Sequence, residues 1–135
     1  MFRKVAIIGF GLIGSSIARE IKKHKLSKII SACDISQTAQ KQIKSLRLAN
    51  EVTSDVAVSV KNADLIFICS PLSAYEKIFL AINKSANKEA IITDVGSSKL
   101  SVVQLAEKIL IIVSSLGINP LCTCQTGFIS NCNSF

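Results

Sequence analysis

Residues 3–20 read RKVAIIGFGLIGSSIARE, and this stretch decides the fold. Two basic residues before an apolar run also fit a secretory signal peptide, which is the alternative interpretation. Glycines at positions 9, 11 and 14 favour another interpretation, because they form G-x-G-x-x-G directly after the apolar residues 5–8. Isoleucines then recur at positions 13, 17 and 21, which predicts an amphipathic helix. Strand, glycine turn and helix follow in the order that a dinucleotide site requires.

Each glycine of this turn has its own expected task. Gly9 allows the tight turn, and Gly14 lets the helix pack closely against the strand. Gly11 lets the backbone approach a pyrophosphate, and we also consider a positive φ there. The helix that follows offers N–H groups and the positive end of its dipole to the phosphates.

An acidic residue lies where the ribose of a dinucleotide is expected. Asp34 follows a predicted strand over residues 28–33 and comes twenty residues after Gly14. A carboxylate there accepts hydrogen bonds from both ribose hydroxyls and repels a 2′-phosphate. No arginine stands among Ile35, Ser36 and Gln37, which favours NAD over NADP. The alternative is that Asp34 caps the helix that starts near Ser36.

Composition predicts one domain with a packed core. The chain has 135 residues, of which 49% are hydrophobic, and its longest apolar runs are far shorter than the roughly 18 residues of a membrane span. The five cysteines include Cys122, Cys124 and Cys132, whose spacing is a poor zinc pattern, so we expect no metal. Without a signal peptide, the thiols are expected to be reduced in the cytoplasm.

Positive charge is concentrated at the start of the chain. Ten of the 16 Lys and Arg residues lie in the first fifty residues, against Glu20 and Asp34. Aromatic residues make up 5% of the chain, so stacking platforms for nucleic acid are not evident. We expect a solvated basic face, with neither nucleic acid nor membrane as a partner.

Strand and helix patterns alternate along the remaining chain. Strands are predicted from Glu51 and over residues 64–69 and 90–94, and helices over residues 36–46, 55–62, 73–82 and 100–110. This order predicts an α/β fold with a doubly wound parallel sheet of the Rossmann type, incomplete at its C-terminal end. Ligands of such sheets bind at the carboxyl ends of the strands, which places the glycine turn, Asp34, residues 70–72 and residues 96–99 around one crevice.

Three segments resemble the prephenate/arogenate dehydrogenase family. They are VAIIGFGLIGSSIA at residues 5–18, NADLIFICSPLSA at residues 62–74 and ITDVGSSKLSVV at residues 92–103. The third is the most specific, because generic NAD domains do not require T-D-V-G-S-x-K. The resemblance covers about residues 3–110.

The resemblance implies NAD-dependent oxidative decarboxylation of prephenate or arogenate in tyrosine biosynthesis. It places Ser97 beside the nicotinamide and the substrate hydroxyl, although a helix cap explains that serine equally well on local chemistry. It assigns Asp34 to the ribose. It assigns the pyrophosphate to Gly9, Gly11, Leu12, Ile13 and Gly14, and the other flank of the cofactor to Ser70, Pro71 and Leu72.

The chain departs from the family beyond residue 110. Where the family has His-Pro-x-x-Gly-Thr-Glu with a catalytic histidine, either Ile118 or Asn119 stands here, and neither accepts a proton. Residues 109–135 contain no charged residue. We therefore expect an NAD-binding domain over residues 1–110 and an atypical tail over residues 111–135. The family's helical dimerisation and substrate domain is expected to be absent, through truncation or a frame shift, which predicts an inactive fragment.

Two other functions remain open. A non-catalytic nucleotide-sensing module has the same fold and needs no histidine. The NAD(P) domain of another oxidoreductase also shares the glycine turn.

Overall fold

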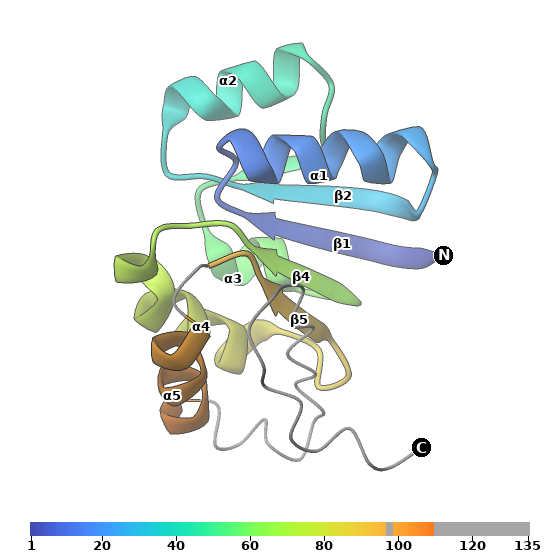
Figure 1. The fold of residues 1–135 in the computed structure, drawn as a ribbon. Helices are drawn as coiled ribbons and strands as arrows, with labels where there is room; N and C mark the ends of the chain where they lie inside the picture. The colour runs from blue at the N-terminus through green and yellow to red at the C-terminus, as the bar shows by residue number, and fades with distance from the viewer. Residues whose placement is uncertain (97–98, 110–135) are drawn as a thin grey trace.

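The computed structural model describes residues 1–96 and 99–109 (Figure 1). The strands are β1 (Phe2–Ile8), β2 (Ser27–Cys33), β3 (Glu51–Thr53), β4 (Leu65–Ile68) and β5 (Ile91–Asp94). The helices are α1 (Leu12–Lys23), α2 (Gln37–Ser45), α3 (Val56–Val60), the 3₁₀ turn η1 (Leu72–Ala74), α4 (Tyr75–Ser85) and α5 (Lys99–Ile109).

The five strands form one parallel sheet in the order β3-β2-β1-β4-β5. Figure 1 shows α1 and α2 over one face of the sheet and α3, α4 and α5 over the other. This arrangement confirms the predicted doubly wound α/β fold. Ile8 pairs with both Cys33 and Ile68, so β1, β2 and β4 end together, and their carboxyl ends share one edge.

The central strand β1 explains the apolar run at the start of the chain. Val5 and Ile7 pack into the core under α1 and α2, whereas Ala6 and Ile8 pack into the core under α3 and α4. All four side chains are at most 2% exposed. A strand buried on both faces reads as a continuous apolar segment. The signal-peptide interpretation of residues 3–20 is therefore wrong for this structure, because the stretch forms the centre of the sheet.

Several element boundaries differ from the predictions by a few residues. β1 begins earlier than residue 5, because the Phe2 N–H donates to the Leu26 carbonyl at 2.9 Å and extends the ladder. α4 begins at Tyr75, since η1 occupies the preceding residues. α3 is shorter than residues 55–62: Asp55 caps its start, and Asn62 has a φ of +61° just beyond its end.

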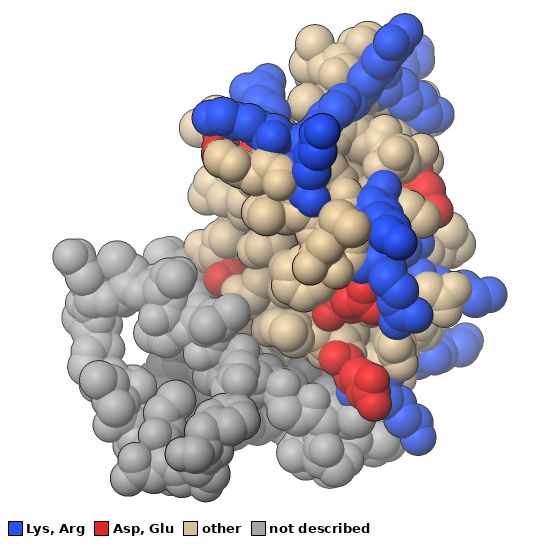
Figure 2. Space-filling model, turned by 90° about the vertical axis from the view of Figure 1, so that its right-hand side faces the viewer, with Lys and Arg blue, Asp and Glu red and all other residues tan. Residues whose placement is uncertain are grey.

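The edge formed by the amino ends of the strands carries much of the positive charge. Figure 2 views this edge and shows Lys and Arg across its top and down its right-hand side. Lys22 and Lys23 lie in the last turn of α1, and Lys44 lies in the last turn of α2. Cations are stabilised at helix C-termini by the macrodipole, so the basic face has a structural explanation. No helix of the described residues is long and apolar enough to cross a membrane.

Candidate nucleotide-binding site

The turn between β1 and α1 requires glycine at its first position. Gly9 has a φ of +87°, which L side chains rarely adopt. A Cβ added there would lie 2.7 Å from Ser70 Oγ and 2.8 Å from the Cys69 carbonyl oxygen. Gly9 therefore makes the tight turn possible, as predicted, and it also lets the loop after β4 approach closely, which the sequence did not predict.

The third glycine brings α1 against the turn. A Cβ added at Gly14 would lie 2.2 Å from the Gly9 carbonyl oxygen and 3.3 Å from Ile7 Cγ2. No side chain fits in that space, because the nearest atom belongs to the backbone. The predicted packing role of Gly14 is confirmed.

The second glycine faces open space. A Cβ added at Gly11 would meet nothing within 4 Å, so the structure leaves room for a ligand to approach. Gly11 is the N-cap of α1 and has a φ of −75°, so the positive φ considered for it is wrong. No side chain caps α1, and its first turn contains no acidic residue. The exposed Leu12 and Ile13 follow directly. An uncapped helix start of this kind suits an anion.

Asp34 lies against this turn from the end of β2. Its Oδ2 accepts a hydrogen bond from the Phe10 N–H at 2.8 Å, and its Oδ1 accepts one from the Ser36 N–H at 2.8 Å. The structure therefore brings the predicted ribose carboxylate to the glycine turn. α2 is capped by Ser36, whose Oγ accepts from the Ala39 N–H at 3.3 Å, and not by Asp34.

The loop after β4 lies beside the glycine turn at the same edge of the sheet. Ser70 Oγ donates to the Ile8 carbonyl at 3.2 Å, which holds the loop beside Gly9. Pro71 follows in an extended conformation, and Leu72 is 42% exposed. The structure thus brings Ser70, Pro71 and Leu72 to the same edge as the glycine turn. Ser97 and the tail cysteines lie outside the described residues.

Sequence reasoning missed the role of Phe10 and a cluster beside the end of β5. Asp94 Oδ2 accepts a hydrogen bond from the Gly96 N–H at 2.8 Å. Tyr75 is fully buried nearby, and burial, together with the Asp94 charge, raises its pKa to about 12. The signal in the sequence was Asp94 itself, within the T-D-V-G segment.

The described cysteines are packing residues. Burial raises the pKa of Cys33 to about 12 and that of Cys69 to about 11, with nearby Asp charges adding to the effect. Thiols with such values stay protonated near neutral pH and are poor nucleophiles. Among residues 1–96 and 99–109, no three His, Cys, Asp or Glu side chains gather in a way that would hold a metal ion.

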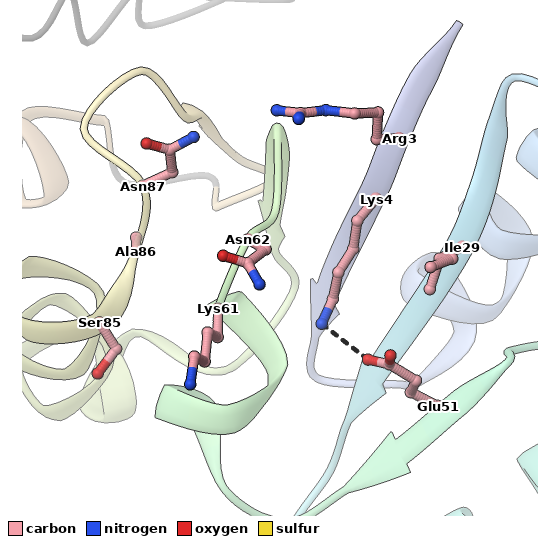
Figure 3. A pocket seen from close by; sticks show the side chains of 9 residues that line it. All are labelled: Arg3, Lys4, Ile29, Glu51, Lys61, Asn62, Ser85, Ala86 and Asn87. Atoms are coloured by element: carbon pink, nitrogen blue, oxygen red, sulfur yellow. Dashed lines mark ion pairs between the residues drawn. The ribbon is translucent and has the colours of Figure 1, made fainter.

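A hollow of about 630 Å³ lies at the opposite edge of the sheet (Figure 3). Lys4 is buried there and pairs with Glu51 at 2.7 Å, as the dashed line shows. The pair joins β1 to β3, and Lys61 and Asn62 line the hollow from the end of α3. None of the predicted site residues lines it.

His24 also lies away from the crevice. It caps the C-terminal end of α1, and its Nε2 lies 3.2 Å from Glu20 Oε2. It is the single histidine of the chain. Because His24 lies at one end of α1 and the glycine turn at the other, the length of the helix separates them.

Comparison with known proteins gives the family. Residues 17–131 match the family described as prephenate dehydrogenase, nucleotide-binding domain. The chain is 38% identical over 104 residues to the cyclohexadienyl dehydrogenase of Zymomonas mobilis, covering 77% of this chain and 36% of that protein. It is 33% identical over 110 residues to the prephenate dehydrogenase of Bacillus subtilis, covering 78% and 29%.

A solved structure shows the same fold. The prephenate dehydrogenase from A. aeolicus, in complex with hydroxyphenyl propionate and NAD⁺, superposes with a TM-score of 0.74 at 24% identity. The match covers 82% of this chain and 39% of that one. The chain spans about a third of the length of these two curated relatives. On its fold and its sequence, this chain belongs to the family of prephenate dehydrogenase nucleotide-binding domains.

Proposed function

We propose that this chain binds NAD and supplies the cofactor-binding domain of a dehydrogenase that oxidises prephenate or arogenate in tyrosine biosynthesis. The observation that carries the proposal is the Asp34 carboxylate, held 2.8 Å from the Phe10 N–H inside the glycine turn. The family match and the NAD⁺ present in the A. aeolicus relative support it. The expected cytoplasmic location stays a prediction.

The glycine turn and the start of α1 bind the pyrophosphate in this proposal. Gly11 leaves the space, and the uncapped N–H groups at residues 11–14 donate to phosphate oxygens. Ser70, Pro71 and Leu72 border the cofactor on its other side. The glycine turn, Asp34 and residues 70–72 would hold and orient NAD, which would supply a hydride acceptor when bound.

Selectivity for NAD comes from the end of β2. Asp34 accepts hydrogen bonds from the ribose hydroxyls, and its charge repels a 2′-phosphate. The next side chain, Ile35, is 90% exposed and carries no charge that would attract that phosphate. NADP is therefore expected to bind more weakly.

The chain by itself is proposed to lack turnover. Removal of the proton from the substrate hydroxyl needs a base, and a positioned general base contributes about 10²–10⁴-fold in rate. Ser97 is assigned to that region by resemblance, but an unassisted hydroxyl is a poor proton acceptor at neutral pH. His24 lies at the far end of α1.

Substrate binding and dimerisation belong to the helical domain of the family in this proposal. The division into residues 1–110 and a tail over residues 111–135 stays a prediction, and the family match itself runs to residue 131.

A nucleotide-sensing module is the second candidate function. The observation in its favour is that the single histidine, His24, lies away from the crevice. Such a module binds the cofactor and changes partner affinity without chemistry.

Absorbance of NADH tests the proposal of an inactive dehydrogenase domain. Purified chain with NAD and either prephenate or arogenate is expected to give no NADH above the background rate, although NAD binds. Clear turnover that Ser97→Ala abolishes would contradict this expectation. It would also exclude the sensing module.

A further inference from the structure

We infer that Asp34 positions the glycine turn as well as binding the ribose, so that phosphate binding depends on its side-chain oxygen Oδ2 even when no ribose hydroxyl is engaged. The inference deepens the proposed function and rests on it. A ribose acceptor needs only a carboxylate at the end of β2. The structure instead provides a partner for every polar atom of Asp34.

The carboxylate adds one hydrogen bond between the two segments beyond the end of the β1–β2 ladder. The last backbone bond between the two segments runs from the Gly9 N–H to the Cys33 carbonyl at 2.8 Å. The next donor along the chain, the Phe10 N–H, is taken by Asp34 Oδ2 at 2.8 Å instead of by a carbonyl. Because the Phe10 N–H belongs to the peptide that joins Gly9 to Phe10, this bond fixes that peptide, one residue before Gly11.

Asp34 is itself held firmly. Its backbone N–H donates to the Thr53 carbonyl at 3.1 Å, and its carbonyl accepts from Gln40 Nε2 at 2.7 Å. Its second carboxylate oxygen accepts from the Ser36 N–H at 2.8 Å. These bonds come from β3 and α2, so the carboxylate does not swing freely toward a ligand.

The turn has few other restraints on the side where the ligand approaches. The Phe10 ring is 7% exposed and packs in the core under α1 and α2, which anchors one end of the turn. Gly11 has no side chain, faces open space and receives no side-chain cap. Loss of the bond from Phe10 to Asp34 therefore loosens the peptide groups that are to bind phosphate.

An NAD analogue whose adenosine ribose lacks both hydroxyls separates the two roles of Asp34. Wild type, Asp34→Ala and Asp34→Asn are titrated with NAD and with this analogue by calorimetry. If Asp34 acts on the ribose alone, wild type and Asp34→Ala bind the analogue equally. Positioning predicts roughly ten-fold weaker binding of the analogue by Asp34→Ala, the size expected for losing a hydrogen bond to a charged group. Asp34→Asn keeps an oxygen for the Phe10 N–H and is expected to recover most of that affinity.

Asp64→Ala is the matched control. Asp64 Oδ2 accepts the Arg3 N–H at 2.6 Å, a bond of the same kind at the other end of β1. Its loss is expected to leave the affinity for the analogue unchanged, and circular dichroism verifies that each variant is folded.

Amide hydrogen exchange at Phe10 in the ligand-free chain gives a readout without cofactor. Exchange is expected to rise at least ten-fold in Asp34→Ala and to stay near the wild-type rate in Asp34→Asn and Asp64→Ala. Equal analogue affinity for wild type and Asp34→Ala, or unchanged Phe10 exchange, would overturn the inference. If wild type binds neither NAD nor the analogue, the proposed function fails, and the exchange rates still decide whether Asp34 holds the turn.

Discussion

At the scale of single residues, the three glycines of one motif do different work. Gly9 and Gly14 serve the fold, since added Cβ atoms would lie 2.7 Å and 2.2 Å from their nearest neighbours. Gly11 has free space around the position of its missing side chain. The motif therefore separates into two positions at which the fold requires glycine and one that leaves space for the proposed ligand.

Gly11→Val is expected to abolish NAD binding with little change in far-UV circular dichroism. The branched side chain fills the space through which the pyrophosphate is proposed to approach, and its Cβ has no protein atom within 4 Å. Calorimetric titration with NAD measures the loss.

Gly14→Ala is the contrasting variant. Its methyl group overlaps the Gly9 carbonyl oxygen, so the chain is expected to melt at a lower temperature or fail to fold.

Unchanged NAD affinity in Gly11→Val would mean that GFGLIG does not bind phosphate.

At the scale of elements, carboxylates from neighbouring segments tether both ends of β1. Asp34 accepts a hydrogen bond from Phe10, just beyond the end of β1. Near the beginning of β1, Asp64 accepts from the Arg3 N–H at 2.6 Å and from the Arg3 guanidinium at 3.0 Å. The Arg3 side chain, followed by the Arg3 backbone, keeps the pKa of Asp64 below its ordinary value. The position of the central strand thus depends partly on ionised side chains.

Asp64→Asn is expected to weaken the acid sensitivity of the fold. A carboxylate whose pKa is lower in the folded state contributes stability above its unfolded pKa of about 4, and this contribution disappears as pH falls through the folded value. The free energies of unfolding of wild type and Asp64→Asn are therefore expected to differ most near neutral pH and to converge in acid. Urea denaturation between pH 2.5 and pH 7 measures both. A constant difference across that range would show that Asp64 ionisation does not stabilise the fold.

The sequence predicts the elements well where one local signal dominates. The apolar run before Gly9, the four-residue spacing of isoleucines in α1 and the cap at Asp55 each identify an element. Boundaries such as Phe2 depend on a bond to Leu26, which no local pattern reveals. The bond between Phe10 and Asp34 joins residues 24 apart and appears only once β1 and β2 are paired in register.

At the scale of the whole molecule, the two edges of the sheet differ in chemistry. The carboxyl edge brings together the glycine turn, Asp34 and the loop from Ser70 to Leu72. The amino edge carries lysines at helix C-termini and the hollow with the pair of Lys4 and Glu51. Helix direction produces this division, because every parallel strand sends its following helix back toward the amino edge. As the rule for parallel sheets predicts, the glycine turn, Asp34 and residues 70–72 share one edge.

The central claim is that the carboxyl edge binds NAD in preference to NADP, and calorimetric titration of the wild-type chain with both cofactors tests it most directly. The account predicts measurable NAD binding and NADP binding that is at least about ten-fold weaker. A ten-fold difference in Kd is equivalent to a binding free energy difference of about 1.4 kcal/mol. The double variant Asp34→Asn with Ile35→Arg is expected to narrow that difference, because it removes the repelling charge and adds a cation beside the ribose. Equal or tighter binding of NADP by the wild-type chain would contradict the account.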